Sequence, residues 1–112
     1  MAYFHQDLTQ AKWNALPKDK QILNVASELL RARNSLAHGY DDNFHNSMDR
    51  ALELIDLSLN DRQQWLGGSL KELLRFREYL AGFYQARKPA DDFSKLIENF
   101  LLFHPQSSLV RL

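Results

Sequence analysis

The sequence has no cysteine, only four glycines and three prolines, and no long apolar run among its 112 residues. Without cysteine there is no disulfide framework and no thiolate ligand for a metal or redox site. Scarce glycine and proline leave long stretches in which a helix can continue unbroken. No apolar stretch approaches the roughly 20 residues that a membrane-spanning helix needs, so we expect no contact with a membrane.

An excess of charge of either sign is also missing. The 14 basic and 14 acidic side chains cancel, so no overall field attracts nucleic acid or an anionic membrane. Any contact with a phosphate group would have to come from a local cluster of side chains. The first seven residues lack the pattern of a signal peptide, and 112 residues suit one domain. We therefore expect a cytoplasmic protein with a single domain over residues 1–112.

Abundant Leu, Ala, Glu, Lys, Arg and Gln favour helices, and no alternation of apolar and polar residues predicts a strand. The predicted fold is all-α, a compact bundle of four main helices plus a short N-terminal helix. The short helix should begin after Asp7, with Gln10 completing its cap, and end at Pro17. The main helices are expected over residues 18–38, over 44–60 after a polar turn at 40–43, over 69–88, and from Asp91 or Asp92 to Pro105.

Apolar residues at helical spacing predict the inward face of each main helix. In the helix over 18–38, Ile22, Leu29 and Leu36 recur every seven residues, and Gly39 is placed to end that helix in a left-handed conformation. A connector with a buried Trp65 should follow the next helix, and a capping box over residues 69–72 should open the one after it. The inward residues of that helix are expected to be Leu70, Leu73, Leu74, Phe76, Leu80, Phe83 and Tyr84.

Four chemically useful side chains gather where the helix over 18–38 is expected to stop, namely Arg33, Asn34, His38 and Tyr40. They can handle a phosphodiester, because histidine titrates near neutral pH and an arginine fork stabilises charge on a phosphoryl group. On an uninterrupted helix Arg33 and His38 would lie about 140° apart. They converge only if the helix ends at His38 or if a second subunit supplies one of them. The structural alternative is that Arg33 pairs with a carboxylate, while His38 pairs with Asn34 and caps the helix.

The spacing of Arg33, His38 and Tyr40 resembles the Arg-x4-His-x-Tyr motif of the HEPN family of all-helical ribonucleases and toxins. The resemblance covers eight of the 112 residues and implies metal-independent cleavage of RNA in a cleft between two subunits. It implies that Arg33 holds the scissile phosphate, that Asn34 orients it, and that His38 moves the proton of the 2′-hydroxyl or of the leaving group. Tyr40 would contact the substrate or accept AMP from a partner nucleotidyltransferase.

A second pattern extends over much of the chain: Phe4, His5, Trp13, Ser27, Glu28, Arg31, Ala32, Asn34, residues 50–54, Asp56, Leu57, residues 70–72, Arg75, Arg77 and Glu78. It resembles a family of short bacterial and archaeal helical proteins without an established function, and implies a fold but no activity. The resemblance highlights one polar set on three helices: Glu28, Arg31, Asn34, Asp56, Arg75, Arg77 and Glu78. If these residues converge, they form an ion-pair network or a small anion or nucleotide pocket, and networks are the commoner outcome.

No cofactor or metal is expected. His38, Asp41, Asp42 and His45 carry suitable donor atoms, but their spacing matches no metal motif. The helix before Pro105 ends in Leu102 and Phe103 and is apolar on more than one face, which indicates burial or a partner.

The leading expectation for function is a non-enzymatic protein-interaction or small-ligand and anion-binding module. We expect it to pair with itself as a homodimer, or with another protein, through its last helix or the end of the helix over 18–38. The alternative is a HEPN-like ribonuclease that uses Arg33 and His38, and RNA is a partner only in that case.

Overall fold

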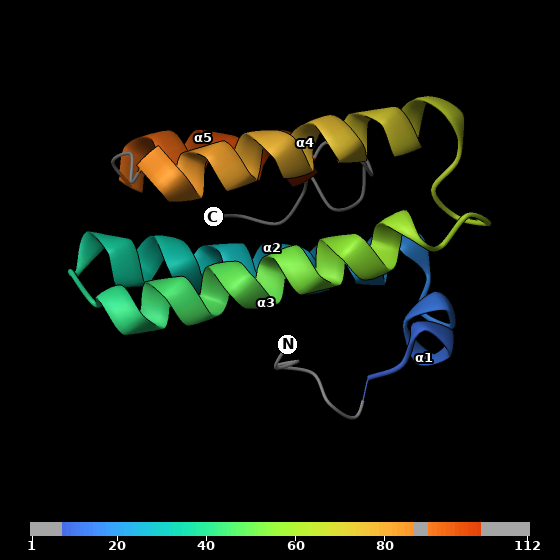
Figure 1. The fold of residues 1–112 in the computed structure, drawn as a ribbon, viewed down its shortest axis with the longest axis horizontal. Coiled ribbons are helices and arrows are strands. Elements are labelled where there is room, and N and C mark those ends of the chain that lie inside the picture. Colours follow the sequence, from blue (N-terminus) through green and yellow to red (C-terminus); the bar gives the residue numbers. More distant parts are fainter. Residues whose placement is uncertain (1–7, 87–89, 102–112) are drawn as a thin grey trace.

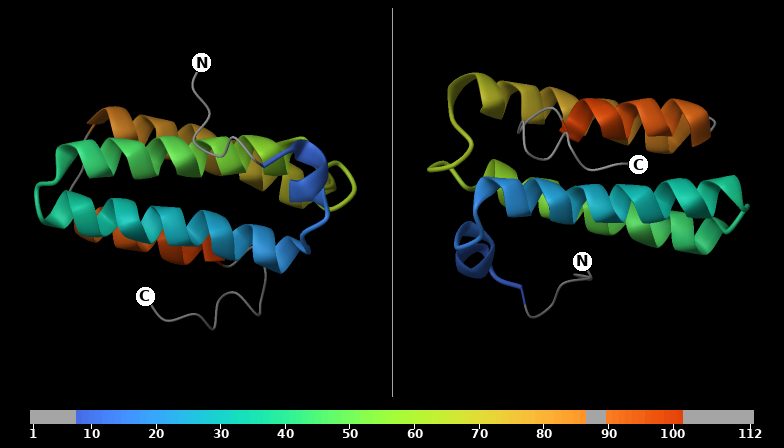
Figure 2. Two further views of the ribbon diagram at one scale, coloured as in Figure 1. Left: turned by 90° about the horizontal axis from the view of Figure 1, so that it is seen from below. Right: turned by 180° about the vertical axis from the view of Figure 1, so that it is seen from behind.

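The structure is a computed structural model that describes residues 8–86 and 90–101, in which five α-helices form (Figure 1). Their bounds are α1 Gln10–Asn14, α2 Lys18–Ala37, α3 Asp41–Leu59, α4 Gly67–Ala86 and α5 Ala90–Leu101. The α2–α3 hairpin packs against α4 and α5, with α4 beside α3 and α5 beside α2 (Figure 2). The short α1 lies at the end of the bundle where α2 begins and α3 ends. The prediction of an all-α bundle of four main helices plus a short N-terminal helix is confirmed.

The end of α2 follows the prediction from Gly39. This glycine has a φ of 74°, a left-handed conformation that residues with a Cβ atom adopt at a cost. The main-chain N–H of Gly39 donates to Leu36 and that of Tyr40 donates to Ser35, which is the hydrogen-bond pattern of a Schellman C-cap. The predicted polar turn over 40–43 is wrong, because α3 already begins at Asp41. Acidic residues such as Asp41 are favourable in the first turn of a helix.

The helices enclose one core of apolar side chains. The buried residues are Trp13 in α1, Ile22, Val25, Ala26, Leu29 and Ala32 in α2, Phe44, Met48, Ala51, Leu54 and Ile55 in α3, Trp65 in the connector, Leu73, Phe76, Leu80 and Phe83 in α4, and Phe93, Leu96, Ile97 and Phe100 in α5. The predicted stripe of α2 and the buried Trp65 are confirmed, although Leu36 is only partly buried. The predicted inward position of Leu74 is wrong, since 47% of this residue is exposed. Leu102 and Phe103 lie outside the described residues.

Two predicted helix starts are wrong. The cap of α1 is Thr9, whose hydroxyl oxygen accepts from the main-chain N–H of Lys12. Gln10 does not complete a cap, because its amide donates to the main-chain oxygen of Leu57, and Asp7 lies outside the described residues. The helix α4 begins at Gly67, and the Ser69 hydroxyl inside its first turn donates to the Leu66 carbonyl instead of forming a capping box.

Within the described ranges, no helix combines the length and the apolar character that crossing a membrane requires.

Candidate functional site

His38 is an exposed residue directly after the last turn of α2. Its Nδ1 atom lies 2.7 Å from the main-chain oxygen of Asn34. A carbonyl oxygen only accepts hydrogen bonds, so Nδ1 must carry the hydrogen in this contact. In the neutral imidazole the lone pair is then on Nε2. The fold therefore fixes the tautomer in which Nε2 of His38 is the basic nitrogen.

The ring of Tyr40 packs on the ring of His38. The two ring centres lie 5.6 Å apart with an angle of 17° between the planes, a stacked arrangement. Tyr40 is 57% exposed, and its position follows from the turn at Gly39. The stack restrains the His38 ring and leaves an aromatic surface open to solvent.

Arg33 and His38 both contact Asn34. The Arg33 guanidinium lies 3.4 Å from the Asn34 side-chain oxygen through Nη2, and 3.4 Å from the Ser94 hydroxyl of α5 through Nη1. Both distances are long for hydrogen bonds, so these neighbours hold the guanidinium only loosely. His38 is the C-cap residue of α2, and its main-chain N–H still donates to the Asn34 carbonyl at 3.2 Å as in a continuing helix, so Arg33 and His38 are related through Asn34, which both contact.

The four predicted residues thus form one connected group at the exposed end of α2. His38 pairs with Asn34 at the helix C-terminus, as the structural alternative also predicted, but through the Asn34 main chain. The described contacts of Arg33 are with a hydroxyl and an amide, not with the carboxylate that this alternative proposed. The group consists of a base, a cation, an amide and an aromatic ring, which suits recognition of a phosphodiester.

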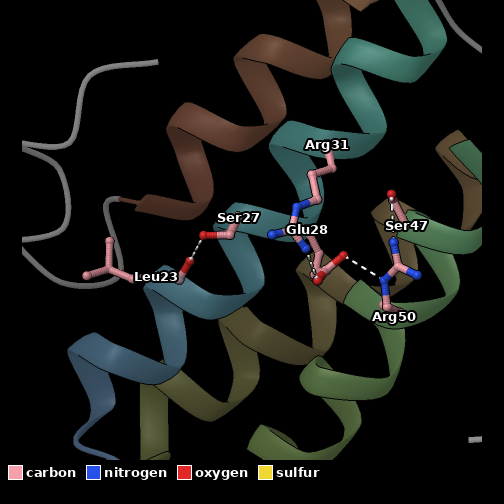
Figure 3. Close-up of polar contacts among 6 residues, drawn as sticks. All are labelled: Leu23, Ser27, Glu28, Arg31, Ser47 and Arg50. Atoms are coloured by element: carbon pink, nitrogen blue, oxygen red, sulfur yellow. Dashed lines mark hydrogen bonds and ion pairs between the residues drawn. The ribbon is translucent and has the colours of Figure 1, made fainter. Parts of the chain in front are cut away.

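The seven residues of the predicted polar set do not converge in one place. Glu28 binds two arginines, with Oε1 2.9 Å from Nη1 of Arg31 and Oε2 2.9 Å from Nε of Arg50 (Figure 3). Arg50, which lies outside the predicted polar set, also reaches the buried Ser47 hydroxyl at 3.4 Å. Only 9% of the Glu28 side chain is exposed. This group therefore joins α2 to α3.

A second, exposed pair joins α3 to α4. Both Nε and Nη2 of Arg77 donate to the Asp56 carboxylate, the second contact at 3.2 Å. The hydrogen bond that Arg77 donates to Asp56 raises the pKa of Arg77 above its usual value. Arg75 and Glu78 are exposed on α4 and belong to neither group. Asn34 instead lies beside His38, so the set is divided among separate sites.

A cavity of about 330 Å³ borders the Glu28 group. Its lining residues are Leu8, Trp13, Leu16, Asn24, Ser27, Glu28, Arg31 and Leu54. Two members of the predicted polar set, Glu28 and Arg31, therefore line this cavity.

A buried polar cluster at the end of the bundle near α1 was not predicted from the sequence. The Gln21 amide nitrogen lies 2.8 Å from the Asp61 carboxylate and 3.0 Å from the main-chain oxygen of Trp13. The Trp65 indole nitrogen donates to the Gln21 side-chain oxygen at 2.8 Å, and Gln64 donates to Asp61 at 2.8 Å. One signal was available: Gln21 adjoins Ile22 on the inward side of α2, and a polar residue in a core needs a partner.

Lys18 lies against the same cluster, with Nζ 4.6 Å from the centre of the Trp65 ring. Burial lowers the pKa of Lys18 from its usual value. The cluster fastens α1, α2 and the connector to one another, and its hydrogen-bonding groups point into the protein.

Among residues 8–86 and 90–101, no three His, Cys, Asp or Glu side chains lie together in a way that could hold a metal ion. His45, which the metal hypothesis included, instead contacts the Tyr84 hydroxyl at 2.5 Å through Nδ1.

Comparison with known proteins gives no match: no family model matches the chain, and no curated protein or solved structure shows significant similarity to it.

Proposed function

We propose that the protein is a metal-independent endoribonuclease, as the HEPN resemblance implies, and that Arg33, Asn34 and His38 carry the reaction. The observation that supports this most directly is the contact between Nδ1 of His38 and the Asn34 carbonyl. It assigns the basic lone pair to Nε2 on an exposed residue. In the sequence analysis this function came second to a non-enzymatic module, in part because of the angle between Arg33 and His38. In this proposal the substrate phosphate lies beside Asn34, which both side chains contact.

The proposed reaction uses the ribose of the substrate as the nucleophile. Nε2 of His38 accepts the proton of the 2′-hydroxyl, and the 2′-oxygen attacks the neighbouring phosphorus. As the new oxygen–phosphorus bond forms, the bond from phosphorus to the 5′-oxygen breaks, and this oxygen takes up a proton from solvent. The products are a 2′,3′-cyclic phosphate and a 5′-hydroxyl end.

Arg33 and Asn34 act on the phosphate. The Arg33 guanidinium is held by two long contacts, so it can turn toward a phosphate oxygen and stabilise the charge that builds there. The Asn34 oxygen faces Arg33, which leaves the amide nitrogen as a donor to a second phosphate oxygen. The exposed Tyr40 ring offers a surface for stacking a base.

Charge near the proposed site opposes binding of RNA. Asp41 and Asp42 are exposed in the first turn of α3, directly after Tyr40, and the chain has no net positive charge. Binding of RNA therefore depends on the charge of Arg33 and on stacking of a base against Tyr40. A homodimer that joins two such sites would double the local cations, in line with the expected two-subunit cleft, and sedimentation with and without RNA tests for it.

The test compares the parent protein with a His38→Asn variant on mixed-sequence RNA in the presence of EDTA. An asparagine amide can still donate to the Asn34 carbonyl, but it has no counterpart of Nε2. We expect cleavage to fall by at least about a hundredfold, the usual contribution of a general base, with unchanged thermal stability. Arg33→Gln should also lose activity, and Arg75→Gln, at an exposed position of α4, is the matched control.

Equal cleavage by the parent and the His38→Asn variant would contradict the proposal, as would products that end in a linear 3′-phosphate from the first moments of reaction. Either result would instead favour a non-enzymatic binding module, which was the leading expectation from the sequence.

A further inference from the structure

The cavity beside Glu28 has two chemically different walls. Its apolar wall consists of Leu8, Trp13, Leu16 and Leu54. Its polar wall consists of Asn24, Ser27, Glu28 and Arg31, and this i, i+3, i+4, i+7 spacing places them along one face of α2. A ligand that matches both walls must have an apolar body and a polar head.

Charge at the polar wall decides which head group fits. Two guanidinium groups, from Arg31 and Arg50, bind the single carboxylate of Glu28, so the negative charge of Glu28 is already compensated. Each carboxylate oxygen already accepts from one arginine, and the Glu28 side chain is only 9% exposed. A cationic head would meet two arginines, whereas an anionic head would meet the exposed guanidinium of Arg31. The charge therefore favours an anion.

Arg31 is the residue positioned to receive that anion. Its contact with Glu28 uses Nη1, while its side chain is 65% exposed and lines the cavity. A planar guanidinium can bind a carboxylate with two parallel hydrogen bonds. Glu28 accepts a hydrogen bond from the Arg31 guanidinium (Figure 3), and the exposed Asn24, one turn before Glu28 and two turns before Arg31 on the same cavity wall, adds a hydrogen-bond donor.

We propose that this cavity binds a small amphipathic carboxylate. The carboxylate pairs with Arg31 and Asn24, and the apolar chain lies along Leu8, Trp13, Leu16 and Leu54. The volume of about 330 Å³ is near the lower limit for small-molecule pockets, which suits a short chain better than a long lipid. The site is separate from the His38 group and does not rest on the ribonuclease.

The test uses three probes with the same eight-carbon chain: octanoate, 1-octanol and octylamine, each below its micelle-forming concentration. Binding is followed by the amide shifts of Asn24, Ser27 and Arg31 in NMR titrations. We expect octanoate to bind most tightly and octylamine most weakly. Arg31→Gln should lower the affinity for octanoate about tenfold and leave the affinity for octanol unchanged. Leu8→Ser should lower the affinity for both probes, and Arg75→Gln should change neither affinity.

Tighter binding of octylamine than of octanoate would overturn the proposal, since it would make Glu28 the receptor. Equal affinity for all three probes would overturn it as well, because the cavity would then recognise only the chain. Absence of shifts with every probe would show that the cavity is not a site for such ligands. The His38→Asn variant should bind octanoate normally, so loss of nuclease activity and loss of octanoate binding are distinguishable.

Discussion

The two ends of the α2–α3 hairpin use polar side chains in opposite ways. Near α1, Gln21 and Asp61 are at most 2% exposed, and their described hydrogen bonds join parts of the chain. At the other end, His38 and Tyr40 are exposed, and one ring nitrogen of His38 is fixed while the other carries a lone pair. A polar group with all its bonds directed inward stabilises the fold, whereas one with a single fixed bond can still act on a ligand.

The largest expected difference between the two ends concerns their aromatic residues. Replacing Trp65 by alanine removes a side chain that is 1% exposed and leaves Gln21 without its indole donor. We expect the free energy of unfolding to fall by about 3–5 kcal/mol. Urea denaturation measures this, with Tyr40→Ala at the opposite end as the control, for which a change within about 0.5 kcal/mol is expected. Similar losses for both variants would remove the contrast.

The second expected difference concerns amide side chains. Gln21→Leu removes donors from the Asp61 carboxylate and from the Trp13 carbonyl, and a buried acceptor without a donor costs about 1–3 kcal/mol of stability. Asn34→Leu alters an exposed residue and should leave the unfolding free energy nearly unchanged while lowering RNA cleavage. If Gln21→Leu leaves the unfolding free energy unchanged, Gln64 alone can satisfy the hydrogen-bonding capacity of Asp61.

The smallest expected effect concerns charge beside the exposed end. Asp42→Asn removes one negative charge from the first turn of α3, close to the proposed RNA site. RNA should then bind about twofold more tightly at low salt, with the gain disappearing as salt screens the charge. Fluorescence anisotropy at two salt concentrations measures the affinity, and Glu72→Gln, at an exposed position of α4, is the control. An equal gain from Glu72→Gln would mean that RNA binds by overall charge.

Local patterns in the sequence predicted much of the fold. The stripe of α2 and the left-handed Gly39 follow from spacing and from one residue type, and both are present. Leu74 was misassigned because α4 has more apolar residues than one face can bury, so periodicity alone allowed both Leu73 and Leu74 inside. Packing against the bundle buries Leu73 completely and leaves Leu74 exposed.

The candidate sites divide in the same way. Arg33, Asn34, His38 and Tyr40 are close together in the chain, and their residue types and spacing predicted the group without knowledge of the fold. The orientation of the His38 ring was not predictable, because it depends on where α2 ends and on which carbonyl near that end the ring can reach.

By itself the sequence determined the four main helical segments, the left-handed Gly39 after α2 and the proximity of Arg33, Asn34, His38 and Tyr40, since all of these depend on residues within one or two helical turns. The tertiary structure alone decided the Gln21–Asp61 cluster, the pairing of Glu28 with Arg50 and the cavity beside it. Gln21 and Asp61 are 40 positions apart, and Glu28 and Arg50 are 22 apart. Contacts over such separations exist only once helices pack, and apolar spacing selects the buried face without specifying its partner.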